Sequence, residues 1–236
     1  MSIDFAFDLH IHTSFGSLDS GITRPFLREA ASRVRLGGLA ITEHTHGWSD
    51  ERLDEFRAEC DFLIIGAREF STEWGHIVTL VQDPEILMLT SVPTVPELRD
   101  AVLAAGGFMI MAHPFRYFPG RSNFLFGDDP ESASYPPEEL ALHPVFQYVD
   151  EVEVLNSGCT VKENQTAQAV AMALGMSGVA GSDAHSPLEV GRCVNIFPHP
   201  IETQEELIWE LRAGAHRIAQ RNREGDLIPL AEAIGL

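Results

Sequence analysis

The segment Asp8-Leu9-His10-Ile11-His12-Thr13 continues a short apolar run that begins at Phe5. The run is typical of a buried β-strand over residues 5–9, which places the two histidines at its carboxyl end. Residues two apart on a strand point to the same face, so both imidazoles can reach one metal ion. A single His-x-His pair is weak evidence by itself, because short motifs often occur without a metal.

Further apolar runs alternate with amphipathic helical segments along the rest of the chain. We expect strands at residues 5–9, 39–42, 62–65, 76–81, 108–112, 151–155, 177–180 and 194–197, and helices at 25–36, 51–60, 95–105, 166–174 and 205–213. Thr94, followed by a proline and by Glu97, has the pattern of a capping box. Strands interleaved with helices predict an α/β fold with a mostly parallel sheet, and seven or eight such units favour a closed barrel.

Segment 117–144 breaks this alternation, because it is rich in Pro, Gly, Asp and Phe and has no clear periodicity. Long irregular connections in compact domains often serve function, so we interpret it as an insertion over the mouth of the site. Its aromatic side chains could form a lid or could anchor the loop. The aromatic group comprises Phe115, Tyr117, Phe118, Phe124 and Phe126. Since no repeat or long linker divides the chain, we expect one domain over residues 1–236.

The composition limits the partners that the chain is expected to bind. The sequence has 35 acidic and 16 basic residues, a net charge of -19, and one lysine, Lys162. Phosphate backbones are gripped by clustered basic side chains, so we expect no broad nucleic-acid binding and favour a small phosphorylated substrate. No apolar run is long enough for a membrane helix and no secretory signal is evident, which predicts a cytoplasmic protein. The oligomeric state stays open.

The remaining candidate ligands lie at or near the ends of the other predicted strands. They are Glu43 and His44, Glu69, His76, His113, and the pair Asp183 and His185. The carboxyl ends of barrel strands form the rim on which α/β barrels build their active sites. Unrelated core histidines have no reason to prefer that rim, so the set is much more specific than the first pair alone.

Five segments in this order resemble the landmarks of the PHP superfamily, the polymerase-and-histidinol-phosphatase domain. They are His10-Ile11-His12, Thr42-Glu43-His44, Glu69-Phe70-Ser71, His113-Pro114 and Asp183-Ala184-His185. Residues 151–156 also resemble a family segment, so the resemblance extends over nearly the whole chain. Three positions depart from the usual pattern: Glu43 replaces the commoner Asp, Ala67 replaces a Gly, and Asp19 stands where some relatives have a His.

The resemblance implies a distorted (β/α)7 TIM-like barrel with two or three divalent metal ions. It assigns His10, His12, Glu69 and Asp183 to the first ion, Glu69, His76 and His113 to the second, and Asp19, His44 and His185 to the third. Imidazole and carboxylate ligands suit Mn, Zn or Fe.

Two such ions can activate a water and neutralise phosphoryl oxygens, so we predict a metal-dependent phosphoesterase acting on a small phosphomonoester or phosphodiester. Asp183, His185 and Arg116 are the expected catalytic residues, Arg116 as a bidentate grip on phosphate. An ordinary salt bridge would explain Arg116 equally well.

Two other hypotheses remain. The same ions could serve an amidohydrolase-like or lactonase-like hydrolase. Alternatively, the chain could be a non-catalytic metal-binding PHP module, whose expected sign is eroded ligand positions. His46 is a further candidate to line the site, whereas His143, His199 and His216 are expected to be ordinary packing or surface residues. Cys60, Cys159 and Cys193 form no CxxC pair and are expected to be reduced thiols.

Overall fold

The structure is a computed structural model and describes residues 5–236. Its strands are β1 (Phe5–Ile11), β2 (Gly38–Glu43), β3 (Leu63–Thr72), β4 (Gly75–Leu80), β5 (Phe108–Met111), β6 (Glu151–Asn156), β7 (Val179–Gly181), β8 (Cys193–Phe197), β9 (Arg217–Arg221) and β10 (Leu227–Pro229). Its α-helices are α1 (Arg24–Arg33), α2 (Asp50–Arg57), α3 (Pro84–Leu87), α4 (Val95–Ala104), α5 (Pro137–Leu140), α6 (Val161–Leu174), α7 (Gln204–Ala213) and α8 (Leu230–Ala233). Two 3₁₀ helices, Ser132–Ser134 and Pro144–Gln147, lie between β5 and β6.

The eight predicted strands and five predicted helices are all present, with shifted ends. The largest shift is in β3, which continues to Thr72. The apolar pattern missed this extension because it contains charged residues that are buried rather than exposed. Arg68 is only 3% exposed, donates to the carbonyls of Leu87 and Leu89, and stacks on Phe70. Strands β9 and β10 were not predicted, because they are short and carry mixed polar sequence.

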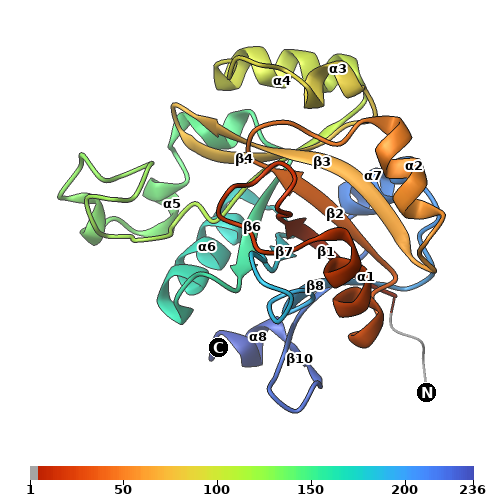
Figure 1. Ribbon diagram of the computed structural model, residues 1–236. Helices are drawn as coiled ribbons and strands as arrows, with labels where there is room; N and C mark the ends of the chain where they lie inside the picture. The colour runs from red at the N-terminus through yellow and green to blue at the C-terminus, as the bar shows by residue number, and fades with distance from the viewer. Residues whose placement is uncertain (1–4) are drawn as a thin grey trace.

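The ten strands form one sheet in the order β10-β9-β8-β1-β2-β3-β4-β5-β6-β7. The sheet curls, so that the end of β7 comes back to the end of β1 (Figure 1). There Ile11 and Ala184 form one parallel bridge, and the His12 amide donates to the Ala184 carbonyl at 3.0 Å. The chain therefore has a mixed α/β fold with a curled half-barrel, and a count of seven β/α units is not confirmed.

The prediction of a mostly parallel sheet is wrong. Strand β4 pairs antiparallel with both β3 and β5, and β8 pairs antiparallel with β1. A parallel crossover needs a dozen or more residues, whereas the tight turn between Thr72 and Gly75 joins β3 directly to β4. The Thr72 hydroxyl donates to the Gly75 carbonyl at 2.7 Å, and Gly75 has φ +96°, which glycine adopts without strain. As a result β4 begins at the rim where β3 ends.

Segment 117–144 projects from the strands at the left of Figure 1, around α5. Its aromatic residues divide between the two roles considered above. Phe115 is buried and packs against Phe118 and Phe126 with ring centroids 5.4 and 5.9 Å away, which anchors the segment. Tyr117 and Phe124 are instead 60% and 62% exposed.

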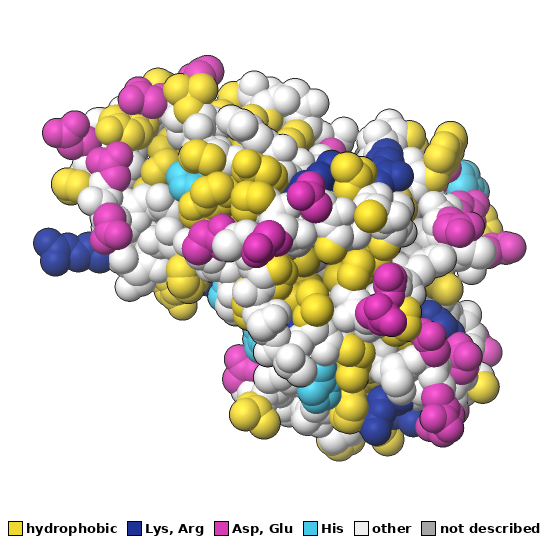
Figure 2. Space-filling view, turned by 90° about the horizontal axis from the view of Figure 1, so that it is seen from above, with side chains coloured by type: hydrophobic (Ala, Val, Ile, Leu, Met, Phe, Trp, Pro, Cys, Tyr) yellow, Lys and Arg dark blue, Asp and Glu magenta, His cyan; other side chains and the backbone are white. Residues whose placement is uncertain are grey.

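Acidic side chains are spread over the face seen in Figure 2, and the few basic ones lie apart from one another. This distribution agrees with the net charge of -19. Among the described residues, no helix has both the length and the apolar character required to cross a membrane.

Asn195 links β8 to β7, two strands that do not pair through their backbones. Its amide oxygen accepts from the Ala180 N–H at 3.0 Å, and its amide nitrogen donates to the Ala180 carbonyl at 2.7 Å. Asn195 is completely buried, so no water can replace these bonds. The side chain thus takes the place of a neighbouring strand for the middle of β7.

Replacing Asn195 should therefore destabilise the fold. In Asn195→Ala the buried N–H and C=O of Ala180 lose their partners, and we expect the free energy of unfolding to fall by about 2–4 kcal/mol. Urea denaturation followed by circular dichroism measures this change. Leu188→Ala, at a residue that is 77% exposed, is the control and should change stability by less than about 0.5 kcal/mol. A loss below about 1 kcal/mol in Asn195→Ala would contradict the role assigned to this amide.

Candidate metal centre

His10 and His12 extend from the end of β1 into the interior of the half-barrel, where both are almost completely buried. The Nδ1 atom of His10 lies 3.0 Å from the Glu153 carboxylate, and that of His12 lies 3.1 Å from the Ser17 hydroxyl. Both Nε2 atoms, together with Oε2 of Glu69, are buried and make no hydrogen bond of acceptable geometry with the described residues, although polar atoms of neighbouring side chains lie close to them. Buried polar atoms are rarely left unpaired, so three of them converging here fit the ligand atoms of a cation site.

Hydrogen bonds fix which nitrogen of His12 carries the proton. The Ser17 hydroxyl donates to Oε2 of Glu43 at 2.7 Å, so it has no second proton for His12. It therefore accepts from Nδ1–H of His12, which leaves the Nε2 lone pair free toward the centre. Glu43 also accepts from Thr13 and from the Trp48 indole at 2.8 Å. The role of Glu43, uncertain from the sequence, is thus to hold the loop that orients His12.

Glu153 was not identified from the sequence as a site residue. Its carboxylate accepts from Nδ1–H of His10, from the backbone N–H of His113 at 2.8 Å, and from the Asn156 amide at 2.9 Å. One buried side chain therefore orients one candidate ligand and positions the backbone of another. The signal that could have found it is an acidic residue at the centre of the buried strand β6.

The backbone of β7 approaches these residues closely at Gly181. A Cβ atom there would lie 2.3 Å from Oε1 of Glu153 and 2.4 Å from Cβ of His10. Only glycine fits at this position, so the end of β7 is packed directly against the pair that Glu153 and His10 form.

Glu69 lies at the middle of the cluster and is completely buried. Its Oε1 is 3.0 Å from Nδ1 of His76 and 3.1 Å from Nε2 of His113, and its Oε2 is 2.9 Å from Nδ1 of His44. Burial would raise the pKa of this carboxyl group, but His10 and the other imidazoles outweigh burial and hold its pKa well below its ordinary value.

Two expectations about strand positions are corrected here. Glu69 lies inside β3 rather than after it, and His76 stands at the start of β4 rather than at a carboxyl end. The β3–β4 register pairs Ser71 with His76, so His76 is on the same face as Glu69. The antiparallel turn, not a parallel crossover, brings these two side chains together.

Asp183 and His113 both have backbone angles in the left-handed region, with φ +53° and +29°. Such angles are strained for non-glycine residues and persist where the surroundings enforce them, commonly at functional sites. Oδ1 of Asp183 lies 3.2 Å from Nε2 of His12. Burial would raise the pKa of Asp183, but His10, His12 and His113 outweigh it and hold that pKa well below its usual range.

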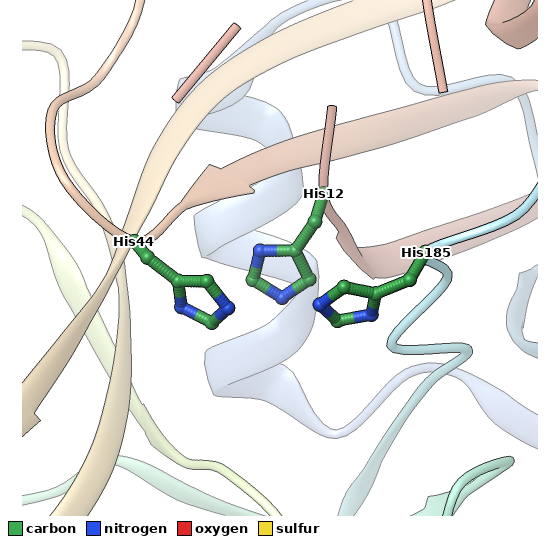
Figure 3. A group of neighbouring side chains, drawn as sticks. All are labelled: His12, His44 and His185. Carbon is green, nitrogen blue, oxygen red and sulfur yellow. The ribbon is translucent and has the colours of Figure 1, made fainter. Parts of the chain in front are cut away.

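A third group is formed by His12, His44 and His185, whose imidazoles converge from three separate segments in Figure 3. The ring of His12 lies 4.1 Å from that of His44 and 4.4 Å from that of His185. Asp19 closes the group from the solvent side, with Oδ2 3.4 Å from Nε2 of His185 and 3.6 Å from Nε2 of His44. Its side chain is 63% exposed, the most exposed of the predicted ligands.

The nine predicted ligands therefore lie in one cluster, although their roles toward metals stay predictions. Ligand atoms within 4.8 Å of one another occur in four overlapping groups. These are His10, His12 and Glu69; His10, His113 and Asp183; Glu69, His76 and His113; and His12, His44 and His185.

Arg116 lies beside the cluster, but its guanidinium is already engaged. Nη2 donates to Asp183 and, at 2.8 Å, to Oδ1 of Asn156. Burial would lower the pKa of Arg116, but the Asp183 carboxylate outweighs it and raises that pKa. The ion pair considered as the simpler explanation is present, and a phosphate-binding role stays a prediction.

The other histidines lie outside the four groups. His46 packs against Phe15 at 5.0 Å between ring centroids. His143 packs among Trp74 and Phe126, His199 bonds to Glu210, and His216 bonds to the Gly178 carbonyl. These last three have the packing and surface roles expected of them.

A family model described as PHP-associated matches residues 161–216, which begin with α6 and include Asp183 and His185. No curated protein matches the chain.

Solved structures with a similar fold include the following three. A two-domain protein from Bacteroides vulgatus containing a predicted PHP-like metal-dependent phosphoesterase has 16% identity and a TM-score of 0.63, covering 91% of this chain and 64% of that one. An amidohydrolase from Chromobacterium violaceum with bound sulfate and no metal has 18% identity and a TM-score of 0.57, covering 93% and 99%. Endonuclease Q, in complex with a 27-mer duplex substrate with an abasic lesion at its active site, has 17% identity and a TM-score of 0.56, covering 89% and 57%.

The endonuclease Q complex overturns the expectation that this chain binds no nucleic acid broadly. That expectation rested on the net charge of -19 and the single lysine. A fold shared by a protein that binds duplex DNA at its active site shows that the composition of the whole chain does not exclude such a substrate. Binding depends on the charge near the site, to which bound cations also contribute.

Glu153 provides a test of how the centre is organised. In Glu153→Ala, His10 loses the acceptor that fixes its tautomer, so affinity for Mn²⁺ or Zn²⁺ should fall about 10–100-fold. Isothermal titration calorimetry measures this affinity. Glu210→Ala is a matched control, because Glu210 is also a buried acid bonded to a histidine but lies away from the centre. Equal metal affinity in both variants would show that Glu153 does not orient His10 for metal binding.

Proposed function

We propose that this chain, a member of the PHP superfamily by its family-model match and its fold, is a hydrolase that cleaves phosphate esters with the help of bound divalent cations. One observation carries the proposal. The buried atoms Nε2 of His10, Nε2 of His12 and Oε2 of Glu69 make no well-directed hydrogen bond with the described residues and face the same cluster of imidazoles and carboxylates. A buried carboxylate and imidazoles in such an arrangement are the ligands that transition metals take in hydrolases.

Two or three cations would be held by the residues assigned from the sequence. The first ion would bind His10, His12, Glu69 and Asp183; the second would bind Glu69, His76 and His113; and the third would bind Asp19, His44 and His185. Mn, Zn and Fe all suit this ligand set. The central position of Glu69, between His44 on one oxygen and His76 and His113 on the other, supports its role as the bridging ligand.

Cations at these ligands would supply an activated water and would neutralise charge on the phosphoryl oxygens. The protein residues would hold these cations and orient the substrate. His185, whose side chain is 28% exposed and whose Nδ1 donates to the Asp183 carbonyl, presents the lone pair of Nε2 toward the solvent-side group, as a ligand of the third ion requires. The leaving oxygen would then take its proton from water. Arg116 would hold Asp183 in place and contribute positive charge beside the phosphate.

A second candidate function is an amidohydrolase-like or lactonase-like reaction. The fold shared with the Chromobacterium violaceum amidohydrolase favours it, and an activated water also attacks carbonyl carbon. A non-catalytic module is less consistent with the structure, because all nine expected ligand positions carry a side chain that can coordinate a metal and all lie together.

Metal content is the first expected outcome. Purified protein, reconstituted with Mn²⁺ or Zn²⁺ and passed through a desalting column, should retain two or three ions per chain by inductively coupled plasma mass spectrometry. If the protein retains no metal ions after either treatment, the proposal is refuted, because it requires bound cations.

Turnover is the second expected outcome. A Mn²⁺-supplemented panel of phosphomonoesters, phosphodiesters, oligonucleotides, amides and lactones should show hydrolysis among the phosphate esters. His12→Ala and Asp183→Ala should each lower that rate at least about a hundredfold. Mutating a residue that only orients a metal ligand already lowers metal affinity or activity about 10–100-fold, and these two residues are proposed ligands themselves. His199→Ala, outside the four groups, should keep the rate of the unaltered protein. Hydrolysis confined to amides or lactones would favour the second candidate instead.

A further inference from the structure

A cavity of about 140 Å³ adjoins the metal centre on the side of His76 and His113. Besides these two histidines, its walls include Gly75, Arg116, Tyr117 and Phe124. Resting on the proposed function, we infer that this cavity receives the leaving group of the substrate and selects a flat aromatic group, with Phe124 as the specificity-determining residue.

The aromatic wall comes from the irregular segment after β5. The Phe124 ring lies 5.2 Å from the His76 ring with an angle of 35° between the planes. Phe124 and Tyr117 are 62% and 60% exposed, whereas Phe118 and Phe126 of the same segment are partly buried and pack against the core. Exposed aromatic rings at a concave site commonly stack with ligand rings.

The segment holds Phe124 in a fixed place. The neighbouring Asn123 is buried and uses its whole amide: the nitrogen donates to the carbonyls of Pro114 and Arg116, and the oxygen accepts from the N–H groups of Leu125 and Phe126. A ring on a preorganised loop loses little conformational entropy when a ligand stacks on it.

Gly75 keeps the cavity open on its opposite side. A Cβ atom at Gly75 would lie 3.2 Å from Cβ of Phe124 and 3.2 Å from Cε of Met111, so any side chain there would fill the space between them. The tight β3–β4 turn therefore does two things: it brings His76 to Glu69, and it leaves room beside His76.

Charge and polarity divide the cavity into two ends. His76 and His113 both contact Glu69 within 3.1 Å, which places the phosphoryl end at the metal centre. Arg116 adds positive charge at that end. Tyr117, Phe124 and Gly75 give the other end two aromatic rings and open space, which suits a ring attached to the phosphorus through the scissile ester oxygen.

Binding of non-hydrolysable phosphonates separates this inference from the proposed reaction. The full chain, loaded with Mn²⁺, is titrated calorimetrically with phenylphosphonate, cyclohexylphosphonate and methylphosphonate. We expect phenylphosphonate to bind about tenfold more tightly than methylphosphonate and more tightly than cyclohexylphosphonate, because a flat ring stacks on Phe124. In Phe124→Ala the advantage of phenyl over methyl should vanish, while the affinity for methylphosphonate stays unchanged. Phe26→Ala removes another exposed phenylalanine, which lies on α1, and should preserve the advantage.

Each result supports or overturns the inference. Equal affinity for the three phosphonates, cyclohexyl binding as tight as phenyl, or an advantage that survives Phe124→Ala would overturn it. These outcomes leave hydrolysis of phosphate esters intact. Conversely, Phe124-dependent phenyl binding in a protein that hydrolyses no phosphate ester would leave the aromatic pocket in place and refute the proposed reaction.

Discussion

A buried negative charge is stable only among positive partners, and Glu69 imposes this requirement on the whole rim of the half-barrel. Its carboxylate is fully buried at the centre of imidazoles that come from β1, β4 and the segments after β2 and β5. An isolated carboxylate in such surroundings would be very costly, whereas cations shared with those imidazoles would balance it. The curl of the sheet, the antiparallel β3–β4 turn and the strained backbone at His113 and Asp183 all serve to bring these partners to one carboxylate.

Much of the site could be predicted because its ligands lie at strand ends, where apolar runs stop and His, Asp or Glu begins. The same signal located β1, β2, β5 and β7 and the loops that carry His12, His44, His113 and Asp183. The residues that orient them could not be found in this way. Glu153 and Ser17 act on histidines 143 and 5 positions away, and Glu43 acts through Ser17, so their roles depend on contacts that no local pattern contains. The parallel sheet was mispredicted for a related reason, because the antiparallel return of β4 depends on the Thr72–Gly75 turn rather than on the strand sequences.

Composition was a poorer guide to partners than the arrangement of charges. The net charge is -19 and acidic side chains are spread over the face seen in Figure 2, yet endonuclease Q shows that a similar fold accepts a duplex substrate at its active site. What a substrate meets here is local: imidazoles, Arg116, the cations proposed to bind there, and the aromatic wall of Phe124 and Tyr117. The irregular segment that interrupts the β/α alternation contributes that wall. It therefore helps to determine the shape of the cavity beside the candidate metal centre.

The central claim is that the buried nitrogen and oxygen atoms around Glu69 that make no well-directed hydrogen bond are metal ligands. Anomalous diffraction from Mn²⁺-loaded crystals, recorded above and below the Mn absorption edge, tests it most directly. The account predicts anomalous peaks at about 2.0–2.3 Å from Nε2 of His10, Nε2 of His12 and the Glu69 carboxylate. Peaks only at surface carboxylates, with His10 and His12 protonated and hydrogen-bonded to Glu69 and Asp183, would contradict it.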